Sequence, residues 1–345
     1  MRVVIQASGR VAFVTLALSI LLAFPIGRAS RAQEEDAWKV EGALLGKHGG
    51  DSKDVSGIAC ETAQAFPRSC VLIDDERQEA QVVDIEDGKL IAGQSISLIG
   101  NRFADEPLEL DGEGVAFNDG FYYVIGSHGH PRDREKKLRP GRDDAEIKAR
   151  IAASSQIVRF HIGPGRTAQA VSRTAKLREA IAAEPALRPF LDRRLENNGI
   201  TIEGVAVRQG HLLAGFRGPT LDEGRAAILS VSLASLFGDD NLEAKIHQLH
   251  LGDGQGVRDL APYDDGILIL SGPSADGPGS YAVYWWNGEN DVVRQLKEIS
   301  SIIDDPKHKP EAILPLDRGP SGIRLLVLSD GAKKGRPVAI DVPEP

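Results

Sequence analysis

Cysteine, methionine and aromatic residues are scarce in this sequence. Its 345 residues include two cysteines, one methionine and 5% Phe, Trp and Tyr. Two cysteines are too few for the disulfide framework of a small cysteine-rich protein. An excess of basic residues is also missing, because 50 Asp and Glu outnumber 41 Lys and Arg and give a formal net charge of −9. This balance argues against general nucleic-acid binding, which depends on excess positive charge.

Signatures of several common enzyme classes are missing as well. The chain has no G-x-S-x-G, H-E-x-x-H, C-x-x-C or G-x-x-x-x-G-K-[ST] pattern, so no motif names a nucleophile, a zinc site or a phosphate-binding loop. What is present is 41% hydrophobic residues with 37 Gly and 19 Pro, the composition of a globular protein. The length allows one large domain or two ordinary ones.

Residues 1–32 have the pattern of a cleavable export signal. Arg2 and Arg10 precede an apolar run, 11–24, and Ser30 and Ala32 are the small residues of a cleavage site. The run is too short to span a membrane as a helix, and a permanent N-terminal anchor is the alternative. Cleavage removes four arginines and no acids, which changes the net charge to −13. We therefore expect a periplasmic or secreted protein with no transmembrane segment in its mature form.

The two cysteines, Cys60 and Cys70, flank a turn-like stretch between two apolar runs. In the oxidising compartment that export implies, a disulfide between them would join the two strands of a hairpin. Two buried free thiols are the alternative.

The rest of the chain repeats one pattern five times. Each copy has an apolar strand that opens with a polar residue and a small residue, a turn, and a second apolar strand that ends in polar residues. The copies recur about every 55 residues, except for one interval about 35 residues longer. Further strand-like runs follow in most copies, including 156–160, 227–231, 281–286 and 292–296. Three or four short strands in a repeat of this size are typical of a β-propeller blade.

We therefore predict an all-β fold, a five-bladed β-propeller over residues 33–345, with six blades or a two-sheet sandwich as alternatives. The last copy is one strand short, and the strand-like segment 38–45 precedes the first copy. Pairing that segment with the final strand, 336–340, would close the ring and remove a free edge.

The long insertions fall at one end of the predicted propeller. They are 129–154, between two strands of the second blade, and 174–199, between the second and third blades. Residues 177–195 have the apolar spacing of a helix, interrupted near Pro185 and Pro189, and would cap the mouth at this end. The loop 132–150 is rich in charges of both signs, which indicates a self-paired, solvated lid, or alternatively an arginine clamp for an anionic ligand.

The same end gathers polar residues. Glu113, Glu203 and Glu311 open the innermost strand in three copies, where Ser56 and Arg258 stand in the other two. Three carboxylates near one axis repel unless something compensates them. One interpretation is a site for Ca²⁺ or another divalent cation, with Glu113, Glu203, Glu311 and Asp75 as candidate ligands. The other is structural, with carboxylates bonded to backbone amides of neighbouring blades and to Arg217 and Arg258.

The segment Ser127-His128-Gly129-His130 also suggests chemistry. Adjacent strand residues point to opposite faces, so Ser127 and His128 are not expected to form a dyad. His128 is the candidate proton carrier, and His128 with His130 could bind a metal beside a carboxylate. His247 and His250 are expected on the surface of an outer strand. The full set of predicted ligand-binding residues is Glu113, Ser127, His128, His130, Asn198, Glu203, Arg217, Arg258 and Glu311.

Four longer runs, 110–116, 124–131, 194–206 and 214–219, resemble the bacterial family called domain of unknown function 3616. The resemblance covers nearly the whole mature chain and implies no activity. The Glu-Gly-aliphatic-Ala repeat alone is similar to exported propellers of the esterase-like phytase kind. That second resemblance implies phosphoesterase chemistry but supplies no matched catalytic residue.

Three functions remain open from the sequence. The first is a non-catalytic binding module whose mouth takes a small polar or anionic molecule or a peptide. The second is a metal-dependent hydrolase of phosphate esters or lactones, with Arg217 and Arg258 holding an anionic group. The third is an envelope interaction scaffold. In each case we expect a monomer that does not bind nucleic acid.

Overall fold

The computed structural model describes residues 37–63, 65–132 and 137–345. The expected export signal, 1–32, lies outside these residues. Within the described ranges, no helix is both long enough and apolar enough to cross a membrane.

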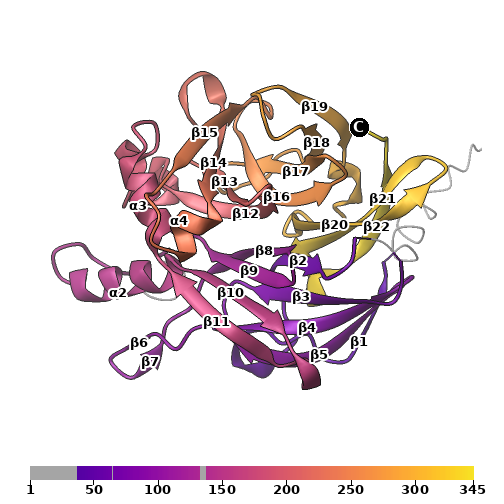
Figure 1. Cartoon of the computed structure of the whole chain (residues 1–345), viewed down its shortest axis with the longest axis horizontal. Helices are drawn as coiled ribbons and strands as arrows, with labels where there is room; N and C mark the ends of the chain where they lie inside the picture. Colours follow the sequence, from indigo (N-terminus) through magenta and orange to yellow (C-terminus); the bar gives the residue numbers. More distant parts are fainter. Residues whose placement is uncertain (1–36, 64, 133–136) are drawn as a thin grey trace, which may run out of the picture. The chain divides into compact units, whose positions relative to one another are not determined.

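Five sheets form the blades of a propeller, each built from strands that follow one another in the chain (Figure 1). The first blade contains β2 (Val55–Cys60), β3 (Arg68–Asp74), β4 (Glu79–Glu86) and β5 (Lys89–Ser97). The second contains β8 (Gly112–Asn118), β9 (Phe121–Gly126), β10 (Ile157–Ile162) and β11 (Ala168–Thr174). The third contains β12 (Thr201–Arg208), β13 (His211–Gly218), β14 (Ala226–Ser232) and β15 (Ala244–Leu249).

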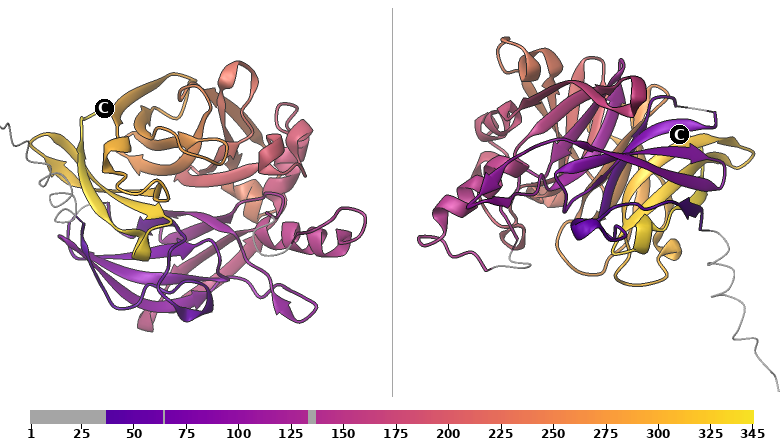
Figure 2. Two further views of the ribbon diagram at one scale, coloured as in Figure 1. Left: turned by 180° about the vertical axis from the view of Figure 1, so that it is seen from behind. Right: turned by 90° about the horizontal axis from the view of Figure 1, so that it is seen from below.

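The fourth blade contains β16 (Gln255–Tyr263), β17 (Gly266–Pro273), β18 (Ala282–Trp286) and β19 (Val293–Glu298). The fifth has only β20 (Lys309–Gly319), β21 (Gly322–Asp330) and β22 (Val338–Val342). The innermost strands contact one another in the order β2, β8, β12, β16, β20, and β20 returns to β2. Figure 2 shows the indigo first blade beside the yellow last blade, so the ring is closed. The prediction of five blades is confirmed, and six blades and a two-sheet sandwich are excluded.

Small residues let the innermost strands approach closely. A Cβ atom added to Gly57 would lie 2.9 Å from the Cα atom of Gly114, and one added to Gly114 would lie 3.0 Å from Cγ1 of Val205. Contacts this short leave no space for a side chain. The glycine that follows the polar residue in these copies is therefore needed for packing between blades.

The predicted ring closure by segment 38–45 is wrong except at its start. Ala37 bridges Val338 of the last blade, and the Trp38 amide donates to the Pro337 carbonyl at 2.7 Å. The chain then turns to the first blade, where β1 (Lys39–Glu41) pairs in parallel with β5. The reason is that β5 also has an open outer edge, which β1 covers.

Two helical insertions lie in the predicted places but differ in extent. The insertion 129–154, expected to be a loop, contains α2 (Asp144–Ser154). The expected helix 177–195 is only α3 (Lys176–Ala183), followed by 3₁₀ turns at Arg188–Phe190 and Leu195–Asn197. Glu184 is extended because it precedes Pro185, and a residue before proline disfavours the helical conformation. Shorter elements complete the fold: β6 (Arg102–Phe103), β7 (Glu106–Pro107) and α4 (Leu233–Phe237).

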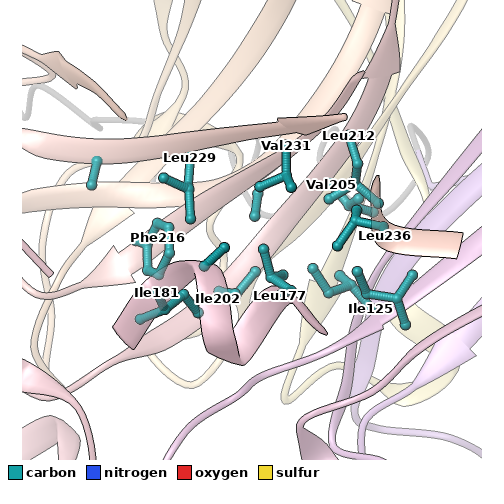
Figure 3. Close-up of a cluster of buried hydrophobic side chains, with 14 of the residues drawn as sticks. Ile125, Leu177, Ile181, Ile202, Val205, Leu212, Phe216, Leu229, Val231 and Leu236 are labelled. Carbon is teal, nitrogen blue, oxygen red and sulfur yellow. The ribbon is translucent and has the colours of Figure 1, made fainter. Parts of the chain in front are cut away.

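The helix α3 is anchored by an apolar cluster between the second and third blades. Leu177 and Ile181 of α3 are fully buried and pack with Ile202, Phe216 and Leu229 of the third blade (Figure 3). Fully burying one side chain of this size stabilises the fold by about 1.5–3 kcal/mol. The insertion 174–199 is therefore fixed to the propeller.

The disulfide prediction is confirmed. Cys60 on β2 and Cys70 on β3 are directly opposite in the antiparallel pair and form a disulfide bond. The alternative of two free thiols is excluded.

Candidate functional site

The five polar residues that open the innermost strands all lie in β-bulges. In every blade the register between the first and second strands shifts so that this residue has no opposite partner. A bulge re-aims a side chain that regular pleating would direct elsewhere. The five residues, called here the ring residues, are all buried and are Ser56, Glu113, Glu203, Arg258 and Glu311.

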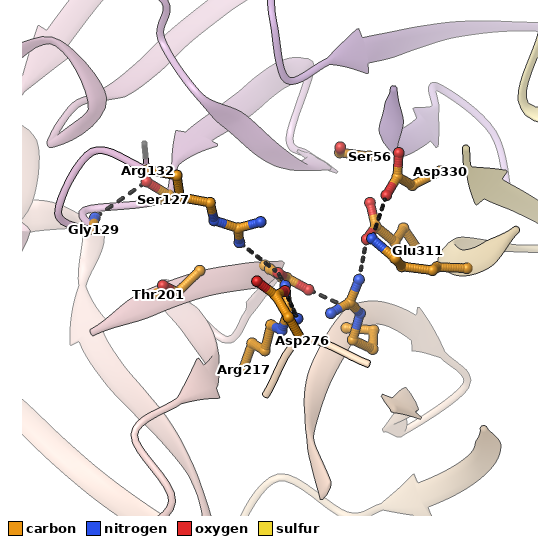
Figure 4. Close-up of polar contacts among 12 residues, drawn as sticks. Ser56, Ser127, Gly129, Arg132, Thr201, Arg217, Asp276, Glu311 and Asp330 are labelled. Atoms are coloured by element: carbon orange, nitrogen blue, oxygen red, sulfur yellow. Dashed lines mark hydrogen bonds and ion pairs between the residues drawn. The ribbon is translucent and has the colours of Figure 1, made fainter. Parts of the chain in front are cut away.

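Two ring glutamates are compensated by arginines (Figure 4). Glu203 accepts a hydrogen bond from Nη1 of Arg217 at 3.0 Å and forms an ion pair with Nε of Arg258 at 2.9 Å. Arg258 also donates to Oε1 of Glu311. Nη2 of Arg217 reaches outward to Asp276 at 2.7 Å. Arg258 thus links Glu203 and Glu311 in one buried network. Arg217 connects Glu203 of this network to the exposed side chain of Asp276.

Burial and pairing set the protonation of this network. Burial raises the pKa of Glu311 to about 8, although the positive charge of Arg258 opposes the shift. Burial would lower the pKa of Arg258, but attraction to Glu203 and Glu311 outweighs it and raises the pKa. Arg258 is therefore a permanent cation inside the ring.

Asp259, the neighbour of Arg258, bonds to backbone amides between blades. Its carboxylate accepts from the amide of Leu260 and, across the blade boundary, from the amide of Ile313, both at 2.8 Å. We expected a structural carboxylate of this kind at the ring glutamates. It is found one residue later, where three other copies have glycine.

Glu113 differs from the other ring glutamates. It is 5% exposed, and no described residue donates a hydrogen bond to its carboxylate or forms an ion pair with it. Carboxylate oxygens of Glu113, Asp75 and Asp111 all lie within 4.8 Å of one another. Burial raises the pKa of Glu113 well above its usual range, and the negative charges of Asp111 and Glu203 add to the shift. This cluster has the donor set of a site for a hard divalent cation.

A pocket opens beside this cluster. It has a volume of about 100 Å³ and is lined by Asp75 and Asp111 together with the basic residues Lys47, Arg132 and Arg150. Lys47 bonds to Glu109 at 2.8 Å, and Arg150 to Glu146 at 3.0 Å. Among the described residues of the loop, 132 and 137–150, Arg142 pairs with Asp143 and Arg150 with Glu146, and Arg132 and Arg150 line the pocket.

The segment around His128 is folded inward. The His128 side chain is 1% exposed, its Nδ1 bonds to the Gly126 carbonyl at 2.9 Å, and burial lowers its pKa to about 4. The hydroxyl of Ser127 instead accepts the amide of Gly129 at 3.1 Å. Separate partners therefore hold Ser127 and His128, and the His128 ring is neutral and enclosed at neutral pH.

Other predicted residues have local partners. His130 bonds through Nδ1 to the Pro131 carbonyl at 3.0 Å. Asn198, in a left-handed conformation, accepts the Thr220 amide at 2.8 Å and donates to the Thr220 carbonyl at 2.9 Å. His247 was expected on the surface, and this is wrong, because it is 3% exposed and packs edge-on against Trp286.

Asp111 and Arg132 were not singled out from the sequence. Asp111 lies two residues before Glu113, a spacing that would place both on one face of a regular strand, although Asp111 has a positive φ of 52° and Glu113 lies in a bulge. That spacing was the available signal. Arg132 begins the loop 132–150, for which the sequence left an arginine clamp as one alternative, but the position of its Nη2 4.0 Å from Oε1 of Glu203 was not predicted.

Comparison with solved structures finds similarities at low identity. An exo-β-1,3-galactanase from Clostridium thermocellum is 10% identical with a TM-score of 0.45, covering 87% of this chain and 61% of its own. This chain thus spans less than two thirds of the galactanase. The Nup133 β-propeller domain from Vanderwaltozyma polyspora is 9% identical with a TM-score of 0.40, covering 84% of this chain and 71% of its own. Such similarities carry no information about activity.

Sequence comparison gives the family. No curated protein sequence matches the chain. The family described as "Protein of unknown function (DUF3616)" matches residues 72–163 and 155–341, which is most of the chain and includes all the ring residues except Ser56. The resemblance noted from the sequence is confirmed, and the chain belongs to the DUF3616 family.

Proposed function

We propose that the mouth binds a small anionic ligand together with a divalent cation, and that Asp75, Asp111 and Glu113 hold the cation. The observation that carries the proposal is the buried carboxylate of Glu113 beside two further carboxylates. The negative charges of Asp111 and Asp75 raise the pKa of Glu113, and a positive charge in the cluster would oppose this shift. A cation such as Ca²⁺ supplies that charge and accepts the oxygen ligands that the cluster offers.

Glu203 and Glu311, two of the candidate ligands from the sequence, are not included in the proposed cation site. Arg217 and Arg258 already neutralise them. Bringing a second cation beside Arg258 would also add like-charge repulsion.

The anionic ligand is inferred from the pocket beside the cluster. Ca²⁺ takes about six to eight oxygen ligands, so three carboxylates leave coordination positions for an oxygen of the ligand. Lys47, Arg132 and Arg150 line the same pocket and can turn toward a negative group. Export to the periplasm or outside the cell belongs to the same proposal, since disulfides persist in oxidising compartments.

Calorimetry of the EDTA-treated mature protein tests the cation. We expect one CaCl₂ equivalent to bind, Glu113→Gln to weaken this binding at least tenfold, and Glu109→Gln to leave it within twofold. Glu109 is the matched control because it lines the same pocket and loses the same charge. Equal binding by wild type and Glu113→Gln, or no binding by wild type, would reject the proposed site.

The ligand and the alternatives are tested next, with inorganic phosphate and malonate as probes in saturating Ca²⁺. Binding that requires the cation and is not followed by turnover supports the binding module. Turnover of a phosphoester or lactone panel that is lost in Glu113→Gln favours the hydrolase instead. Cellular phenotypes that survive in Glu113→Gln favour the scaffold.

A further inference from the structure

A second cavity lies at the opposite end of the propeller. The ring residues stand at the start of the innermost strands, whereas this cavity is lined by the later halves of β2, β8, β16 and β20. Its volume is about 360 Å³, within the range of about 300–1,000 Å³ that holds small molecules. Most of its inner wall is apolar, with Ile58, Val115, Leu260 and Ile313 among the lining residues.

One basic side chain in the wall of this cavity is buried. Arg68, the first residue of β3, is 2% exposed. Its Nη1 donates to the carbonyls of Ala63 and Pro315, both at 2.9 Å, which fixes the position of the guanidinium. Within the described part of the chain, Arg68 forms no ion pair, and its Nε and Nη2 have no hydrogen-bond partner.

The two unpartnered nitrogens lie on one edge of the guanidinium. Nε and Nη2 present parallel N–H groups, the arrangement that pairs with both oxygens of a carboxylate. Leaving such donors buried without acceptors is unfavourable, because they lose their hydrogen bonds to water. Burial also lowers the pKa of Arg68, since the negative charge of Asp317 compensates only part of the desolvation.

We propose that this cavity is a second binding site, and that its ligand is a small amphipathic carboxylate whose head pairs with Nε and Nη2 of Arg68 and whose apolar body fills the cavity. A carboxylate satisfies both donors and the charge at once, and the apolar wall gains from burying the hydrocarbon.

The Phe66 ring packs beside the Arg68 guanidinium. The ring is partly exposed and lies 5.2 Å from Cζ of Arg68. The free nitrogens are shielded from solvent, so we expect the Phe66 ring to move when the head group enters. Four acidic residues line the cavity, and arginines pair with two of them, Arg318 with Asp264 and Arg324 with Asp317; the other two are Glu61 and Asp119.

Calorimetry of the mature protein with decanoate tests the site, with decan-1-ol and decylammonium as probes of the same chain length. We expect one decanoate to bind at least tenfold more tightly than either probe. Arg68→Gln should weaken decanoate binding at least tenfold. Arg225→Gln is the matched control, because it loses the same charge, pairs with Glu223 and does not line the cavity, and it should leave binding within twofold.

Two further variants keep the test decisive. Ala59→Leu fills the cavity without touching the guanidinium and should abolish decanoate binding, which decides the matter if Arg68→Gln does not fold. Glu113→Gln should not change decanoate binding, which separates this site from the mouth. Equal affinity for decanoate and decan-1-ol, tighter binding of decylammonium, no binding at all, or unchanged binding by Ala59→Leu would overturn the proposal.

Discussion

Arg217 and Glu203 form an ion pair inside the third blade, with Nη1 and Oε1 3.0 Å apart and side chains 3% and 4% exposed. Arg217 is itself skipped in the register between β12 and β13, at the step next to the bulge that holds Glu203. The irregularity on each strand therefore brings one member of the pair to the axis. Breaking a buried pair of this kind leaves an uncompensated charge, which is more costly than the pair is stabilising.

Arg258→Met is expected to destabilise the protein by about 3–5 kcal/mol, because it leaves the Glu203 carboxylate buried with less positive charge and removes the donor to Glu311. Urea unfolding at neutral pH measures the loss. Arg324→Met is the control, since its pair with Asp317 is 29% and 37% exposed and an exposed pair contributes about 0–1 kcal/mol. Similar losses in both variants would contradict a special role for the ring network.

The lowered pKa of the buried His128 is expected to make the folded protein less stable in acid. The folded pKa of about 4 lies below the model-peptide value of 6.5, so the unfolded chain binds a proton that the folded chain excludes. Stability is therefore retained above pH 6.5 and falls as the pH drops toward 4, by up to about 3 kcal/mol.

His128→Asn removes this dependence. Asparagine tolerates the positive φ of 54° at this position and can donate to the Gly126 carbonyl. The gap in unfolding free energy between wild type and variant at pH 7 should shrink by pH 4. Parallel curves across this range would show that His128 does not carry the acid sensitivity.

The effect of Glu113→Gln on the melting temperature is expected to have one sign in EDTA and the opposite sign in Ca²⁺. In EDTA the variant should melt at or above the wild-type temperature, because an unpartnered buried carboxyl is replaced by a neutral amide. In millimolar Ca²⁺ the wild type should melt higher, since a ligand that binds the folded state stabilises it. Melting curves of both proteins, with Glu109→Gln alongside, measure the crossing, and curves that keep the same order would argue against the cation.

Replacing both Cys60 and Cys70 with alanine is expected to cost about 3 kcal/mol, the loop-closure term for a crosslink of this size. The two residues are 10 positions apart. Chemical unfolding of oxidised wild type and the double variant measures the difference. Reduced wild type is the control and should resemble the variant.

The number of blades was predictable because close packing between the innermost strands requires a small residue at one position in most of the repeats. Gly57, Gly114 and Gly204 stand at equivalent places, where the next innermost strand leaves no space for a side chain. Period and strand order follow from such local constraints. The strand that pairs with β1 could not be predicted in this way, because the outer edges of both β5 and β22 were available for pairing.

The candidate site was predictable in composition but not in pairing. The sequence indicated that Glu113, Glu203 and Glu311 are equivalent, yet Arg217 and Arg258 compensate only two of them. That asymmetry depends on distances of a few ångströms between different blades. The cavity beside Arg68 could not be predicted from the sequence, because nothing in the sequence distinguishes a buried arginine with unpartnered donors from any other arginine in a strand.

Because of the bulges, the pairing of the innermost strands does not depend on which side chain stands at a ring position. Each ring residue lacks a cross-strand partner, so exchanging it breaks no pair in the ladder and shifts no strand. Serine, glutamate and arginine already occupy the same position in this one chain. After a blade is duplicated, its ring position can therefore acquire a new side chain while the scaffold is preserved, and the mouth can change its ligand one blade at a time.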